Sequence, residues 1–252
     1  MMTLDAIGSA ILDVAVRDRR LSSNPAKDVR TPRRKPMPKV YLTHSQVERL
    51  APASRYPDVI RFLAYTGLRW DEATGLRVEH VDSKRHRVRV EENAVLVGSH
   101  VEVGTPKTHE RRVVPYPVFL DETIRRATRD KPQSALLWPA IEGGYLRQEN
   151  ARDGRFATAV RRVRAADKIV AAEAKAAGRE APPIMPQITP HKLRNTAASL
   201  AISAGANVKG VQRMLGHASA AMTLDKYADL FDDDLHRVAE ALDEQRRLHL
   251  EQ

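Results

Sequence analysis

Four short stretches of the sequence carry side chains that could do chemistry. They are Thr66-Gly67-Leu68-Arg69, Pro106-Lys107-Thr108, His191-Lys192-Leu193-Arg194 and Leu215-Gly216-His217, the last followed ten residues later by Tyr227. Arginine offers fork-shaped donors that fit a phosphate, histidine and lysine transfer protons, and tyrosine is a nucleophile once it loses its proton. Each stretch alone could also have no function, because an arginine after a glycine turn is usually solvated and a tyrosine is usually a half-buried packing residue.

Taken together, the stretches and their surroundings resemble the tyrosine recombinases, the phage-integrase type of site-specific DNA recombinase. The likeness runs from about Asn24 to Asp234 and keeps the order of the blocks. The surrounding residues that carry it are Trp70-Asp71-Glu72, Arg112-Val113-Val114-Pro115, Thr189-Pro190, Asn195-Thr196, Ala218-Ser219 and Thr223-Leu224-Asp225-Lys226. The resemblance therefore implies an enzyme that cleaves and rejoins DNA.

The resemblance assigns Arg69 and Arg194 to the two arginines that hold the scissile phosphate, Tyr227 to the nucleophile, and Glu72 to a supporting acid. Attack on a phosphodiester adds negative charge to its non-bridging oxygens, which permanently protonated guanidinium groups stabilise. The product is a covalent 3′-phosphotyrosyl link, which keeps the energy of the phosphodiester, so ATP is not needed. The sequence has no phosphate-binding loop or paired-histidine zinc motif, and we expect neither cofactor nor metal.

The same resemblance assigns proton transfer to His191 and Lys107, and a phosphate contact to His217. His191 matches the histidine of the His-x-x-Arg block and is the better candidate for general base. His217 occupies the position of a second histidine or a tryptophan and would hydrogen-bond the phosphate. Lys107 falls in the hairpin turn of the catalytic lysine, which protonates the leaving 5′ oxygen; His109, two residues along, leaves the register open.

Hydrophobic periodicity predicts the elements that must position these side chains. Valine-rich alternation over residues 86–97, 101–103 and 111–116 predicts a sheet whose last turn carries Lys107. Helices are expected after an N-cap at Thr43 and over residues 4–16, 57–65, 71–76, 150–177, 190–205, 207–215, 220–227 and 235–248. The expected fold class is mainly α with a small three-stranded antiparallel sheet (α+β), the tyrosine recombinase catalytic core.

The composition favours a polyanionic partner. The 252 residues include 42 Lys and Arg against 32 Asp and Glu, for a net charge of +10, and no cysteine. The missing cysteine excludes disulfides, thiolate zinc sites and a thiol nucleophile. Residues 17–39 hold nine basic and two acidic residues with four prolines, which predicts an extended strap on DNA phosphates. Its candidate contacts are Arg30, Arg33, Arg34 and Lys35, and a solvated tail is the alternative.

Three segments follow from this pattern: a helix over residues 1–16, a basic linker over 17–39 and a catalytic domain over 40–252. The resemblance identifies the first helix as the remnant of a core-binding domain, which family members usually carry whole. We therefore expect weak DNA binding and poor site selectivity from this chain alone. Asn195 is a second departure, because the family commonly has histidine directly after the second arginine.

The resemblance implies double-stranded DNA with attachment-type sites as partner, and a homotetramer on DNA that is weakly associated or monomeric without it. It implies no membrane or small-molecule partner and a cytoplasmic, nucleoid-associated protein of bacterial or phage origin. Two alternatives stay open: a type IB-like topoisomerase, and a truncated or inactive DNA-binding relative. The helix over residues 235–248 contacts either a neighbouring subunit or its own core, and the helix of Tyr227 docks in cis or in trans.

Overall fold

The computed structural model describes residues 4–27, 29, 39–97, 100–104, 111–146, 155–230 and 234–250. The chain divides into two compact units, Met1–Lys39 and Val40–Gln252. The first unit contains the helix α1 (Leu4–Arg17), and the Asn24 side chain returns to it, donating to the Ser9 carbonyl at 3.0 Å and to Asp13 Oδ1 at 2.6 Å. The four predicted DNA contacts of the linker lie outside the described residues. None of the described helices is long and apolar enough to span a bilayer.

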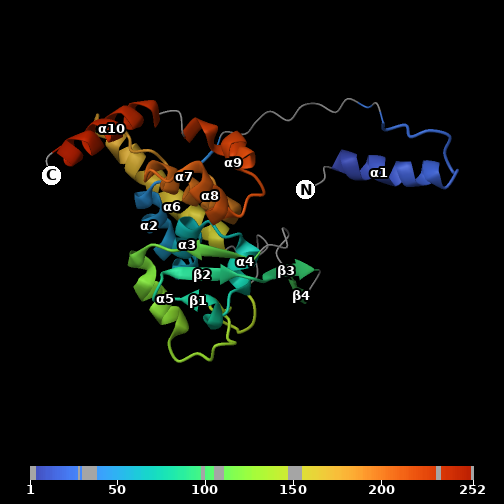
Figure 1. Cartoon of the computed structure of the whole chain (residues 1–252), viewed down its shortest axis with the longest axis horizontal. Coiled ribbons are helices and arrows are strands. Elements are labelled where there is room, and N and C mark those ends of the chain that lie inside the picture. Colours follow the sequence, from blue (N-terminus) through green and yellow to red (C-terminus); the bar gives the residue numbers. More distant parts are fainter. Residues whose placement is uncertain are drawn as a thin grey trace. The chain divides into compact units, whose positions relative to one another are not determined.

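The second unit is mainly helical (Figure 1). Its helices are α2 (His44–Ala53), α3 (Pro57–Thr66), α4 (Trp70–Gly75), α5 (Asp121–Thr128), α6 (Arg155–Ala176), α7 (Pro190–Ser203), α8 (Val208–Leu215), α9 (Ala220–Tyr227) and α10 (Asp234–Leu250). Thr43 caps α2 as expected, in a capping box with Gln46 that satisfies free N–H groups at both ends of the first turn. All of these helices except α5 were predicted, with ends that differ by a few residues where the structure describes them.

The antiparallel sheet differs in membership from the prediction. Three strands pair in the order β1-β2-β5: β1 (Val81–Asp82), β2 (Arg87–Val90) and β5 (Arg112–Pro115). The strands β3 (Asn93–Val97) and β4 (His100–Gly104) form a separate two-stranded ribbon, which stands apart from the larger sheet in Figure 1. The expectation that residues 86–97 form one strand is wrong, because the chain leaves β2 after Val90 and buries Asn93 and Ala94 beside α4 instead.

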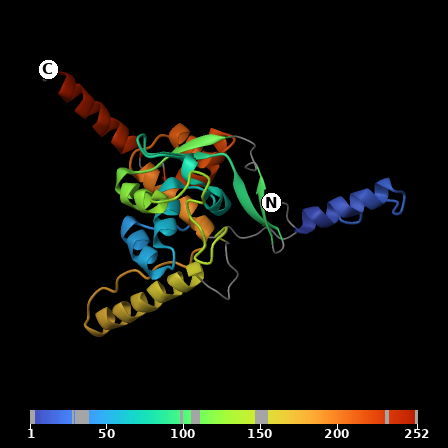
Figure 2. The ribbon, with the colours of Figure 1, turned by 90° about the horizontal axis from the view of Figure 1, so that it is seen from below.

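Two buried clusters hold the helices around the site. The larger one joins α2, α3, α6 and the inner face of the sheet, with the rings of Phe62 and Trp138 5.2 Å apart. Figure 2 shows α6, in yellow, along one side of this unit. The smaller cluster joins α7, α8 and α9 through Ala198, Ile202, Val211, Leu215 and Tyr227. The helix α7 contributes Leu193 to the larger cluster and Ala198 and Ile202 to the smaller one, so it packs against both.

Candidate active site

Arg194, in the second turn of α7, is a buried charge, with 2% of its surface exposed. Its Nη1 donates to the Gly67 carbonyl at 2.6 Å, and its Nη2 donates to the Leu215 carbonyl. These two carbonyls lie at the ends of α3 and α8, where helix dipoles concentrate negative charge. Burial, followed by repulsion from Arg69, lowers the pKa of Arg194 to about 10, so the side chain remains protonated at neutral pH and joins three helices.

Gly67 makes this arrangement possible. It ends α3 with a left-handed φ of 68°, a conformation that favours glycine. A Cβ at this position would lie 2.8 Å from Leu215 Cδ2 and 3.3 Å from Ala197 Cβ. The glycine therefore lets the ends of α3 and α8 approach closely enough for one arginine to bind both.

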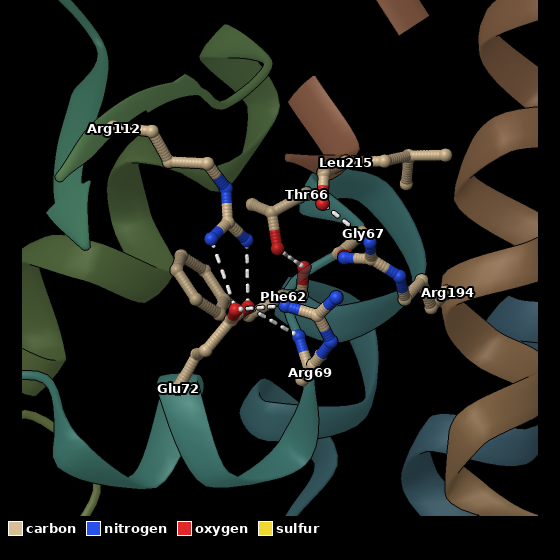
Figure 3. A network of polar contacts seen from close by, with 8 residues as sticks. All are labelled: Phe62, Thr66, Gly67, Arg69, Glu72, Arg112, Arg194 and Leu215. Carbon is tan, nitrogen blue, oxygen red and sulfur yellow. Dashed lines mark hydrogen bonds and ion pairs between the residues drawn. The ribbon is translucent and has the colours of Figure 1, made fainter. Parts of the chain in front are cut away.

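Arg69 lies two residues after Gly67 and directly before α4. Its backbone N–H and its Nη1 both donate to the Glu72 carboxylate at 2.8 Å. Glu72 is 1% exposed, whereas the Arg69 side chain is 30% exposed, so the carboxylate holds the arginine from the protein side. Figure 3 shows the guanidinium groups of Arg69 and Arg194 beside each other, with Arg112 reaching the Glu72 carboxylate from another direction.

Arg112, at the start of β5, is a contact that the sequence did not reveal. Its Nη1 and Nη2 donate to the two Glu72 oxygens at 2.9 and 2.6 Å. Burial raises the pKa of Glu72, but the hydrogen bonds and positive charges of Arg112 and Arg69 outweigh it and lower that pKa to about 2. The carboxylate is therefore ionised at neutral pH. Arg112 belonged to a recognised sequence block, but no role was predicted for it.

His217 follows the left-handed Gly216, which ends α8 with φ 64°. Its Nδ1 shares a hydrogen bond of 2.9 Å with Thr223 Oγ1, and its carbonyl accepts from Gln212 Nε2 at 2.9 Å. Burial, and then the nearby cations led by Arg194, lower the pKa of His217 to about 4. The imidazole is therefore neutral at pH 7.

Tyr227, the last residue of α9, has no exposed surface. Its hydroxyl donates to Asn195 Oδ1 at 3.0 Å, and its ring stacks on His217 with centroids 6.3 Å apart. Burial, only partly offset by Arg194, raises the pKa of Tyr227 to about 12. Asn195, noted in the sequence as a departure from the family, thus holds the hydroxyl inside the protein.

His191 lies in the first turn of α7, directly after Pro190, as expected for a helix N-terminus. Its side chain is exposed. Partial desolvation, then Lys226 and Arg194, lower its pKa below the ordinary value. Lys226 was not predicted as a site residue; its Nζ lies 5.5 Å from the centroid of the Tyr227 ring. Its position beside the tyrosine, in a matched block, was the only available signal.

The structure brings six of the predicted residues into one cluster: Arg69, Glu72, His191, Arg194, His217 and Tyr227. Lys107 and its alternative His109 lie outside the described residues, so their position remains a prediction. Within the parts of the chain that are described, no three histidine, aspartate or glutamate side chains group as a metal site. The cluster offers converging arginines, neutral histidines and a phenol, a set suited to binding a phosphate and transferring protons.

The low pKa of His217 makes the folded protein sensitive to acid. The unfolded chain takes up this proton near pH 6.5, and the folded chain only near pH 4, so unfolding binds protons between these values. Stability contributed by neutral His217 is complete above about pH 6.5 and decreases as the pH falls towards 4. We expect His217→Gln to flatten the fall of the melting temperature across this range.

The matched control is His249→Gln, which changes an exposed histidine of α10 and should leave the pH profile of melting unchanged. A His217→Gln profile parallel to the wild type between pH 6.5 and 4 would show that the buried imidazole titrates as it does in the unfolded chain.

Comparison with known proteins places these features in a family. Residues 40–233 match the phage integrase family. The transposase from transposon Tn916 of Enterococcus faecalis is 28% identical over 237 residues, which cover 85% of this chain and 52% of the transposase. The integrase of Mycobacterium phage D29 is 27% identical over 226 residues, covering 85% of this chain and 54% of the integrase. The chain thus spans about half the length of these curated relatives.

A solved structure agrees with the fold. The Tn1549 transposon integrase, in complex with circular intermediate DNA, superimposes with a TM-score of 0.64 at 24% identity, covering 93% of this chain and 76% of that one. The match over residues 40–233 takes in every described residue of the cluster. The chain belongs to the phage integrase family of tyrosine recombinases.

Proposed function

We propose that this chain is the catalytic region of a site-specific DNA recombinase that forms a covalent 3′-phosphotyrosyl intermediate without metal or ATP. The observation that carries the proposal is the meeting of Arg69, directly before α4, with Arg194 of α7, which also lies near the phenol of Tyr227. The net charge of +10 and the DNA bound to the Tn1549 integrase support double-stranded DNA as the substrate.

Binding of the scissile phosphate falls to the two arginines. Arg194 uses two of its N–H donors on carbonyls, which leaves the remaining donors of its guanidinium for phosphate oxygens. Arg69 is oriented by Glu72 and partly exposed. Donors fixed before the substrate arrives stabilise the charge that develops in the transition state without reorganising.

Attack requires Tyr227 to lose its proton and to leave Asn195. A phenol with a pKa of about 12 is a weak nucleophile at neutral pH, so a base must act during attack. His191, exposed and with a lowered pKa, is neutral and able to accept that proton. His217 then hydrogen-bonds the phosphate, and Lys107 protonates the departing 5′ oxygen. Movement of the short helix α9 exposes the hydroxyl.

The proposed assembly is a homotetramer on attachment-type DNA sites. In α10, Leu242, Leu248 and Leu250 are exposed, so these side chains do not join the core of their own chain. An apolar groove of about 410 Å³ between β5, α7 and α8 is lined by residues that include Val113, Ala201 and Met214. If the α10 leucines of a second copy bind in this groove, the apolar surface of the leucines and of the groove is removed from water, which stabilises the assembly.

The proposal is tested by trapping the protein on DNA. Wild-type protein is incubated, with EDTA and without ATP, with a pool of duplexes nicked beside randomised central sequences, because loss of the short leaving strand prevents religation. We expect a complex that survives SDS and contains the 28.2 kDa chain joined to a DNA 3′ end. Native mass measurement of a parallel reaction, kept free of SDS, should give four chains per pair of bound DNA sites.

Each other outcome has a definite meaning. Binding without a covalent complex supports the inactive DNA-binding relative, and a complex lost in EDTA contradicts the metal-free mechanism. In a parallel assay on a supercoiled plasmid, relaxation by single chains without strand exchange favours the topoisomerase alternative.

A further inference from the structure

Arg112 connects three parts of the candidate active site although it is not one of the predicted phosphate ligands. It binds the buried Glu72 carboxylate with both ends of its guanidinium, and the same side chain packs on Gly216, directly before His217. We propose that Arg112 is a positioning residue that holds Glu72 so that Glu72 can orient Arg69, and that supports the turn presenting His217. This inference rests on the proposed function.

The contact with Glu72 leaves the carboxylate with no free orientation. Each carboxylate oxygen accepts two hydrogen bonds: Oε1 from Arg69 Nη1 and Arg112 Nη1, and Oε2 from the Arg69 backbone N–H and Arg112 Nη2. Each of the two arginines therefore binds both oxygens of the carboxylate, and Arg194 also interacts with it electrostatically. Loss of the Arg112 fork would remove one of the two hydrogen bonds on each oxygen and let the carboxylate rotate towards Arg69.

The contact with Gly216 is made by the stem of the same side chain. A Cβ on Gly216 would lie 2.9 Å from Arg112 Cδ and Nε and 3.1 Å from Cζ. The Arg112 Nε is buried and has no hydrogen-bond partner among the described residues, so this edge of the guanidinium serves as a packing surface. Glycine at 216 thus allows the side chain to pass directly over the backbone before His217.

The place of Arg112 in the chain extends this connection. It is the first residue of β5 and pairs with Val90 of β2, which anchors the strand in the sheet. In the sequence it follows Lys107 by five residues. One side chain thus joins the start of this strand to the α4 corner that carries Arg69 and to the end of α8 that carries His217.

An ion pair with a purely structural role would also be buried and fully bonded. The two interpretations differ in what removal of the arginine changes. A positioning role predicts that DNA still binds but the chemical step slows, because Arg69 no longer sits where the phosphate needs it. A purely structural role predicts less folded protein, with the remaining folded molecules reacting normally.

The experiment compares Arg112→Met, Arg112→Lys, Glu72→Gln and the double variant Arg112→Met/Glu72→Gln by covalent trapping on the nicked DNA at several DNA concentrations. We expect Arg112→Met to lower the limiting rate by about 100-fold with little change in the half-saturating DNA concentration. Arg112→Lys should recover part of the rate, because it restores the charge but not the fork. The double variant should be no slower than the slower single variant.

The control is Arg126→Met, which removes an arginine of α5 that also binds a carboxylate, Asp58 Oδ1 at 2.8 Å, on an exposed surface. It should trap at the wild-type rate. A normal limiting rate for folded Arg112→Met, or a loss that lysine does not recover and that adds fully to that of Glu72→Gln, would overturn the proposal.

A readout independent of catalysis separates this inference from the proposed function. In nitrogen NMR spectra the Nε–H signal of Arg69 should be sharp in the wild type, broadened in Arg112→Met and restored in Arg112→Lys. If the wild type traps no DNA, the proposed function fails. If the Arg69 signal is also unaffected by Arg112→Met, the positioning role fails as well. A broadened signal would support it in the absence of catalysis.

Discussion

Replacing Tyr227 by phenylalanine is expected to abolish the SDS-resistant complex with nicked DNA, a loss of at least about 10³-fold in trapping rate. The change removes only the hydroxyl that would bond to phosphorus and keeps the ring that stacks on His217. Asn195 Oδ1 loses its donor inside the protein, which costs about 1–3 kcal/mol of unfolding free energy. The protein should therefore fold and bind DNA but not react, as a gel of the SDS-treated reaction would show.

Tyr116→Phe is the matched control. Tyr116 is buried as well, and its hydroxyl has no hydrogen-bond partner among the residues described, so its removal should change neither trapping nor stability appreciably. A covalent complex formed by Tyr227→Phe at the wild-type rate would mean that another side chain attacks the phosphate, and the assignment of Tyr227 would be wrong.

The buried hydroxyl of Tyr227 indicates that the structure represents a resting state of the proposed enzyme. A phenol bonded to Asn195, with its pKa raised to about 12, is not placed to attack a phosphate as proposed. Arg194 precedes Asn195 in the same turn of α7, so the residues proposed to hold the phosphate and to hold the resting phenol are neighbours. We therefore expect phosphate binding at Arg194 to affect the hydrogen bond between Asn195 and Tyr227, because Arg194 and Asn195 are adjacent in the backbone.

Local sequence signals were sufficient for the helical part of the fold. Gly67 predicted the end of α3 and Pro190 the start of α7, because backbone geometry at glycine and proline depends little on distant residues. The resemblance, rather than periodicity, then selected which polar residues meet. Arg69 and Arg194 are far apart in the sequence. The hydrophobic periodicity of α3 and α8 does not predict that the ends of these two helices bind the same arginine.

The missed features depend on contacts between distant segments. Arg112 begins a valine-rich strand, where an arginine usually faces solvent, and its partner Glu72 lies 40 residues earlier. The division of the predicted sheet was missed for a similar reason. Alternation over residues 86–97 is the same for one long strand as for two strands that pair with different partners. The buried hydroxyl of Tyr227 donates to Asn195, a residue that the sequence offered only as an exception to the family pattern.

Replacing Arg194 by alanine is expected to remove both catalysis and a large part of the stability. The Gly67 and Leu215 carbonyls would lose their donor in a site that is 2% exposed, and a cavity would form between three helices. Unpaired buried carbonyls cost about 1–3 kcal/mol each. We therefore expect a clearly lower urea midpoint, together with a trapping rate reduced by at least about 10³-fold in the folded fraction.

Arg194→Lys separates the two effects. A lysine keeps the charge but has a single ammonium group, which cannot bind both carbonyls and a phosphate with the geometry of a guanidinium fork. We expect the stability to fall less than in the alanine variant and trapping to remain strongly impaired. Arg161→Ala, on the exposed face of α6, is the control for loss of one positive charge and should change neither measurement. Normal trapping by Arg194→Lys would show that charge alone is enough at this position, and the bidentate phosphate contact would have to be abandoned.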